Sequence, residues 1–195
     1  MPPDRRARTP EQWATEGREP GGDRRLEGMP SENAVETLQR SLRDLLRQNA
    51  GNGRLVVAID ALDAAAAAAF ADGFAAAVGE DGTAVFRATL ADGAEDARER
   101  VVAPFRAGEP FDDGGPAPAS AVLVIDGRFL HAAGLRGLWN WSVWLEANPP
   151  VGTPRPELPD AEKQYLRESR PRAAASVIVE NSDPAHPVQV FGDFC

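Results

Sequence analysis

The chain has 195 residues, 43% of them hydrophobic, and a net charge of -9 at neutral pH. This fits one globular domain, and no apolar run reaches the ~18 residues that a membrane-spanning helix needs. The acidic balance argues against a nucleic-acid partner, because clustered Lys and Arg supply most affinity for phosphates. One cysteine and two distant histidines exclude a zinc site or a disulfide framework, so any metal would be oxygen-bound magnesium.

The first thirty residues differ in composition from the rest of the chain. Residues 1–30 are rich in Pro, Gly, Arg and Glu and hold few large apolar side chains, so we predict a disordered tail. One domain is expected over residues 31–195. Met29, which precedes a helix start, is a candidate translation start. No signal peptide is expected, since the N-terminus lacks an apolar centre, and this places the protein in the cytoplasm.

The domain begins with a helix, a strand and a second helix. From Asn33, which can cap, apolar residues recur every three or four positions as far as Leu46, as in an amphipathic helix. Residues 54–60 form a continuous apolar run, which is typical of a buried parallel strand. Residues 64–78 are dominated by alanine, the best helix former.

The same alternation continues to the C-terminus. We predict strands over residues 83–89, 121–126, 141–146 and 176–180, and helices over residues 95–102, 129–138 and 160–174. Glycine- and proline-rich stretches at 108–118 and 147–159 are predicted loops. The pattern therefore predicts a three-layer α/β domain with a five-stranded parallel sheet flanked by helices.

In such sheets ligands bind beyond the carboxyl ends of the strands, so the first strand-to-helix turn is the place to look for a site. A phosphate loop, G-x-x-x-x-G-K-[ST], needs glycines to wrap the phosphates, a lysine to neutralise them and a hydroxyl for magnesium. The corresponding positions are Ala61, Leu62, Asp63, Ala64, Ala65, Ala66, Ala67 and Ala68. None of the required residue types is present. Composition alone favours an ordinary helix that Asp63 caps, and a carboxylate there would repel a phosphate.

Several ordered segments give the chain a family resemblance. They are VAID at 57–60, FAD at 70–72, VLVIDGRFL at 122–130, LRGLW at 135–139, WSVWLE at 141–146 and VIVENSDP at 177–184. Together they resemble uridine kinase-like P-loop NTPases of actinobacterial type, over residues 54–195. The resemblance implies the P-loop kinase fold, phosphoryl transfer to a nucleoside, and a nucleotide or nucleoside as partner. It implies Mg-ATP as cofactor if the protein is active, and otherwise none.

The chain also departs from the family pattern. The aspartate that acts as base on the nucleoside hydroxyl falls on Ala91, which leaves the adjacent Asp92 as the candidate catalytic residue. The nucleoside-contacting segment is reduced to residues 93–100, and the proline-rich residues 147–159 replace an arginine-bearing lid. Asp126, at the end of the third strand, is the candidate magnesium-side acid, although aspartates there often only cap the next helix.

Two further groups of side chains could contact a nucleotide. The arginines that could reach a phosphate are Arg155, Arg167 and Arg170. A solvated surface position is the commoner role for such side chains. The aromatic candidates for base stacking are Trp139, Trp141 and Trp144. Core packing is favoured for them, because tryptophan contributes a large apolar area.

Hydrolase chemistry is not supported, because Ser142 lacks a G-x-S-x-G context and His131 has no visible nucleophile partner. The resemblance and the departures from it imply a catalytically impaired pseudoenzyme with a P-loop kinase fold, or a truncated non-functional relic, and the sequence identifies no protein partner. Loss of the lysine, the magnesium hydroxyl and the base removes several powers of ten in rate, at ~1.4 kcal/mol per tenfold. Two alternatives remain open: an active nucleoside kinase with an atypical phosphate loop, and a non-catalytic Rossmann-like interaction module.

Overall fold

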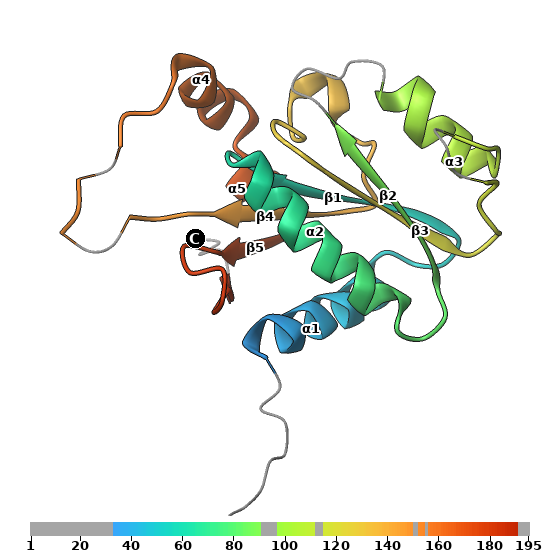
Figure 1. Ribbon diagram of the computed structural model, residues 1–195. Coiled ribbons are helices and arrows are strands. Elements are labelled where there is room, and N and C mark those ends of the chain that lie inside the picture. Colours follow the sequence, from blue (N-terminus) through green and yellow to red (C-terminus); the bar gives the residue numbers. More distant parts are fainter. Residues whose placement is uncertain (1–32, 91–96, 112–114, 150–151, 155, 191–195) are drawn as a thin grey trace, which may run out of the picture. The chain divides into compact units, whose positions relative to one another are not determined.

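The computed structural model in Figure 1 describes residues 33–90, 97–111, 115–149, 152–154 and 156–190. The predicted tail, Ala91, Asp92 and Arg155 lie outside these ranges. Within them, no helix is long and apolar enough to cross a membrane.

A six-stranded sheet forms the centre of the domain. Its strands are β1 (Arg54–Ala61), β2 (Ala84–Leu90), β3 (Ala121–Gly127), β4 (Trp141–Glu146), β5 (Val177–Glu180) and β6 (Val188–Val190), in the order β2-β3-β1-β4-β5-β6. The first five are parallel, as predicted, and β6 adds an antiparallel edge to β5. Strand β6 was not predicted, because it is only three residues long and gives no periodic signal.

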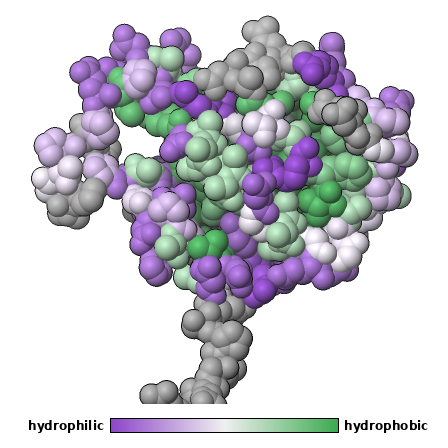
Figure 2. Space-filling view, in the orientation of Figure 1, coloured by the Kyte–Doolittle hydropathy of each residue, from purple (hydrophilic) through white to green (hydrophobic). Residues whose placement is uncertain are grey.

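Helices α1 (Ala34–Asn49) and α2 (Ala64–Gly79) cover one face of the sheet (Figure 1). The predicted cap is confirmed, since Asn33 Oδ1 accepts from the Val35 amide at 3.1 Å. Leu42 of α1 and Phe74 of α2 are fully buried, and the Phe74 ring stacks on Trp141 at 5.8 Å. Figure 2 shows the outward side of α2 as a weakly hydrophobic band bordered by hydrophilic residues.

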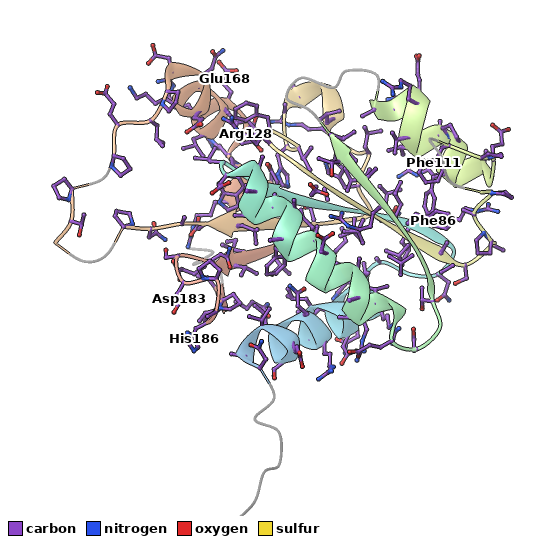
Figure 3. All side chains as sticks on the ribbon, viewed as in Figure 1. Phe86, Phe111, Arg128, Glu168, Asp183 and His186 are labelled. Carbon is purple, nitrogen blue, oxygen red and sulfur yellow. The ribbon has the colours of Figure 1, made fainter. Side chains whose placement is uncertain are left out.

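The opposite face carries α3 (Ala103–Ala107), α4 (Asp160–Ser169) and α5 (Pro171–Ala174). Under α3, the rings of Phe86, Phe105 and Phe111 pack with centroids 5.7–5.8 Å apart (Figure 3). Trp144 and Tyr165 pack in a smaller cluster beneath α4. Helices on both faces confirm the predicted three-layer α/β architecture.

Two helix predictions are wrong in extent. The predicted helix at 129–138 is only a 3-10 turn, η3 (Ala133–Leu135), because Phe129 and Gly137 both adopt positive φ angles, 64° and 76°. The predicted helix at 160–174 is divided into α4 and α5 at Arg170, whose φ is 47°. A residue before proline is disfavoured in the α conformation, and Pro171 therefore ends α4.

The predicted helix at 95–102 also differs in extent. Its described part forms the π-helical turn η2 (Arg98–Val102) and leads directly into α3. Pro104 does not end it: it lies in the first turn of α3, which follows the wider π-helical turn without a break. The helical segment therefore continues to Ala107.

Candidate functional site

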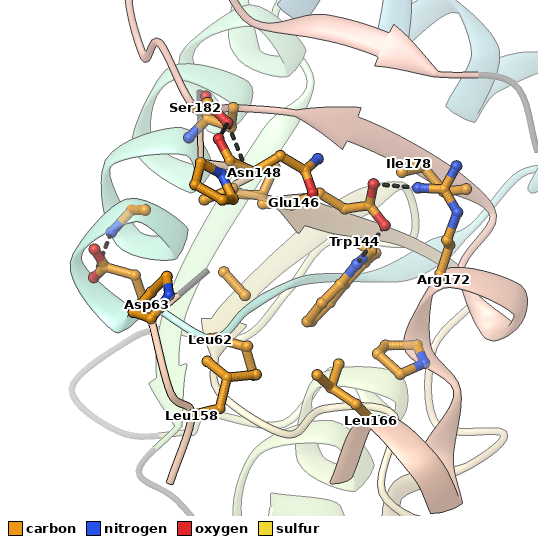
Figure 4. Close-up of a pocket in the computed structure, with 18 of the residues that line it drawn as sticks. Leu62, Asp63, Trp144, Glu146, Asn148, Leu158, Leu166, Arg172, Ile178 and Ser182 are labelled. Atoms are coloured by element: carbon orange, nitrogen blue, oxygen red, sulfur yellow. Dashed lines mark hydrogen bonds and ion pairs between the residues drawn. The ribbon is translucent and has the colours of Figure 1, made fainter. Parts of the chain in front are cut away.

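A cavity of about 960 Å³ opens at the carboxyl ends of β1, β4 and β5 (Figure 4). Its walls come from the start of α2, the end of β4, the proline-rich segment, the α4–α5 junction and the loop after β5. Leu62, Trp144, Leu158 and Leu166 supply much of its apolar lining. This is the position where α/β sheets of this kind bind ligands, and the sequence analysis placed the site at one edge of it.

The first turn of α2 occupies the position of the predicted phosphate loop. The helix begins at Ala64, and Asp63 caps it. Asp63 Oδ1 accepts from the Ala65 and Ala66 amides at 2.9 and 3.3 Å, which confirms the predicted cap. The free N–H groups that would bind an anion are thus already engaged by a carboxylate. Ala64 to Ala68 form regular helix and do not wrap around a bound group.

Asp126, the candidate magnesium-side acid, is fully buried at the end of β3. Its Oδ1 forms an ion pair with Arg87 Nη2 at 2.8 Å, and both carboxylate oxygens accept from Thr89 Oγ1 at 3.1 Å. Arg87 also reaches Asp72 Oδ1 on α2 at 3.0 Å. A guanidinium therefore stands beside the carboxylate that a magnesium ion would need.

Sequence reasoning missed Arg87, although a signal existed. It is the only charged residue of β2, and a half-buried charge in a strand requires a partner. In the described part of the chain, no group of three His, Cys, Asp or Glu residues could hold a metal ion. Without a lysine or hydroxyl at 61–68, and with Asp126 engaged, these residues do not fit Mg-ATP. The roles of Asp126 and of residues 61–68 stay predictions.

A buried polar cluster lies under α4, and it corrects the view that His131 has no nucleophile partner. His131 Nδ1 lies 2.7 Å from Asp60 Oδ2, and His131 Nε2 lies 3.1 Å from Ser142 Oγ. The Tyr165 hydroxyl donates to Asp60 Oδ2 and accepts from the His131 amide at 3.1 Å. Asp60 is 71 positions from His131 and 105 from Tyr165, so sequence spacing gave no indication that these residues meet.

The order Ser–His–Asp resembles a nucleophile triad, but its surroundings do not support catalysis. Ser142 and His131 are each only 5% exposed, and neither lines the large cavity or the smaller one between α1 and α2. Ser142 Oγ also accepts from the Ser176 amide at 3.3 Å. Burial, followed by the charge of Asp60, raises the pKa of Tyr165, which keeps its proton as a donor. The cluster ties α4 to β1 and β4.

The candidate arginines and tryptophans are divided between the cavity wall, the core and the surface. Arg170 lines the cavity, whereas Arg167 does not. Trp139 donates from Nε1 to the Leu130 carbonyl at 2.8 Å and packs against the core, and Trp141 is core, as expected. Trp144 is largely buried but also lines the cavity.

Comparisons with known proteins found similarity only to solved structures. The chain matches no family model and no curated protein. A possible uridine kinase from Bacillus stearothermophilus is 18% identical, with 75% of this chain and 97% of that chain covered and a TM-score of 0.52. A kinase assigned to a fructose transport system in a Silicibacter species is 18% identical over 78% and 86%, with a TM-score of 0.37. The chain therefore has a kinase-like α/β fold with a mostly parallel six-stranded sheet flanked by helices.

Proposed function

We propose that this chain is a ligand-binding protein with a P-loop kinase-like fold that does not transfer a phosphoryl group from Mg-ATP. The observation that carries the proposal is the Asp63 carboxylate on the first amides of α2, at 2.9 and 3.3 Å. A phosphate at this helix end would have to displace the carboxylate and would meet a like charge. The protein's own side chain thus fills the anion site.

The chain also lacks the side chains that a phosphate loop uses for phosphoryl transfer. Charge-assisted hydrogen bonds are worth about 1.5–3 kcal/mol each, and the phosphate-loop lysine and magnesium hydroxyl have no counterpart among residues 61–68. Each ~1.4 kcal/mol of lost transition-state stabilisation lowers the rate tenfold. Arg87 adds to this loss, because it holds the Asp126 carboxylate at 2.8 Å. Together these changes remove several powers of ten in rate.

Ligand binding is supported by the cavity itself. Its volume of about 960 Å³ lies at the upper end of the range for small-molecule sites, ~300–1,000 Å³. Its lining combines apolar side chains with a few polar residues, such as Asn148 and Ser182; the Ser182 hydroxyl accepts from the Asn148 amide at 2.7 Å and donates to the Asn148 carbonyl at 2.8 Å. The resemblance to uridine kinases makes a nucleoside without phosphates one class of ligand to test, since the Asp63 carboxylate disfavours the phosphates of a nucleotide.

The test compares the parent with Asp63→Ser, which keeps a capping hydroxyl and removes the charge. Mg-ATP is titrated by calorimetry, and phosphate transfer to uridine and cytidine is assayed. We expect neither binding nor turnover in the parent, and weak ATP binding without turnover in Asp63→Ser. Asp44→Ser, which removes an exposed charge from α1, is the control and should gain nothing. Turnover in the parent near ordinary kinase rates, ~1–100 per second, would refute the proposal.

A further inference from the structure

The charges around the cavity are unevenly satisfied. Among the residues that the structure describes, four charged ones line it: Asp63, Glu146, Arg170 and Arg172. Asp63 caps α2, and Glu146 forms an ion pair with Arg172 and accepts from Trp144 Nε1. Arg170 has no side-chain partner among the residues that the structure describes. One positive charge at the cavity wall is therefore left for a ligand.

The rest of the lining is mainly apolar. The side chains that could receive an apolar body are Leu62, Trp144, Leu158, Leu166, Pro171 and Ile178. They come from the turn between β1 and α2, from β4, β5, α4 and α5, and from the proline-rich segment, so that the apolar surface surrounds the space on several sides (Figure 4). A ligand that fills it would bury apolar area, at roughly 25 cal/mol per Å².

Arg170 holds its position through an unusual backbone conformation. Its φ of 47° and ψ of 57° are left-handed, which is uncommon for a residue other than glycine, and they form the break between α4 and α5. Such strain persists only where the surrounding structure requires it, and it occurs frequently at ligand sites. At this break the chain turns along the cavity wall, so Arg170 belongs to the lining whereas Arg167, one turn earlier, does not.

We propose that the cavity binds an amphipathic organic acid, whose carboxylate pairs with Arg170 and whose apolar body lies against Trp144 and Leu166. This rests on the proposed function and specifies its ligand. A carboxylate carries one charge, which matches the one unpaired guanidinium of the described lining, and it can accept two parallel hydrogen bonds from that group. A phosphate monoester carries about -1.5 to -2 charges and would share the cavity with the Asp63 carboxylate. The carboxylate is therefore the favoured head group.

The experiment uses one ring system with three head groups. 1-Naphthoate, the neutral 1-naphthamide and 1-naphthyl phosphate are titrated by calorimetry into the full-length chain. We expect 1-naphthoate to bind at least about tenfold more tightly than either of the others. Decanoate, titrated in parallel, distinguishes a ring from an alkyl chain as the apolar body, and binding of either acid supports the proposal when that acid binds at least about tenfold more tightly than 1-naphthamide.

Arginine variants identify the contact. Arg170→Gln should weaken the binding of 1-naphthoate about tenfold or more, which is the effect of losing one charge-assisted pair, and should leave the binding of 1-naphthamide unchanged. Arg167→Gln, which removes an exposed arginine from the last turn of α4, should change the affinity for neither compound. Arg170→Gly, which suits a positive φ, is a second variant that keeps the backbone and should behave as Arg170→Gln does.

Three results would overturn the inference: no binding of either acid, equal binding of 1-naphthoate and 1-naphthamide, or tighter binding of 1-naphthyl phosphate. Unchanged 1-naphthoate affinity in both Arg170 variants would do the same. These outcomes are independent of the Mg-ATP assay. A chain without turnover that fails to bind the acids loses this inference alone, whereas kinase turnover in the parent removes the proposed function.

Discussion

Replacing Tyr165 with phenylalanine tests how firmly the buried cluster holds α4 on the sheet. The change removes one hydroxyl, which donates to Asp60 Oδ2 and accepts from the His131 amide at 3.1 Å. The aromatic ring stays, so its contacts with Phe129 and Trp144, at 4.8 and 6.3 Å between centroids, are kept. Any loss of stability therefore reports the hydrogen bonds and not the packing.

The magnitude follows from burial. A hydrogen bond to a charged group contributes about 1.5–3 kcal/mol, and a buried donor left without a partner costs about 1–3 kcal/mol. Because the surrounding side chains can relax in part, we expect the free energy of unfolding of Tyr165→Phe to fall by roughly 3 kcal/mol. For a chain of 150–250 residues this lowers the melting temperature by roughly 6–12 °C. Thermal unfolding followed by circular dichroism measures it, with the exposed Gln164→Ala as a control that should melt like the parent.

The pH dependence provides a second readout. Burial and the charge of Asp60 raise the pKa of Tyr165, whereas in the unfolded chain its pKa is about 10. A raised folded-state pKa gives stability that is present below pH ~10 and is lost above it, as only the unfolded chain releases the proton. Tyr165 is the only tyrosine, so tyrosinate absorbance should appear only on unfolding. A Tyr165→Phe variant that melts within a degree of the parent, or tyrosinate in the folded protein near pH 10, would contradict this reasoning.

Two further predictions concern the strand ends. Arg87→Met leaves the buried Asp126 carboxylate without its ion pair and should lower the free energy of unfolding by about 3–5 kcal/mol. Asp72→Asn, at an exposed partner of the same arginine, should lower it by less than about 1 kcal/mol. Equal losses in urea unfolding would show that Asp126 is not the main partner of Arg87. Rebuilding the loop with Ala61→Gly, Ala64→Gly, Ala66→Gly, Ala67→Lys and Ala68→Thr should raise ATP affinity in calorimetry but give no nucleoside phosphorylation, since the base position remains Ala91. No gain in affinity would mean that these residues are not a former phosphate loop.

Local sequence was sufficient for the elements whose signal lies within a few turns. The apolar run of β1, the alanine-rich α2 and the Asp63 cap were all predictable, because strand burial, helix propensity and capping depend on neighbouring residues. The helix predicted at 129–138 was wrong, because helix propensity gives no information about the positive φ angles that Phe129 and Gly137 adopt. The three-residue β6 is too short to show a period and forms only by pairing with β5.

What the sequence by itself determined was the α/β alternation, the place where a site should lie, and the absence of a phosphate loop there, since these depend on residue types in local order. The tertiary structure alone decided which distant groups meet. It brought Asp60, His131, Ser142 and Tyr165 together, and it placed Arg87 on Asp126. It also left Arg170 at the cavity wall. The physical reason is that buried charges and hydroxyls take their partners from whichever strands and helices pack beside them, and that packing is long-range in sequence.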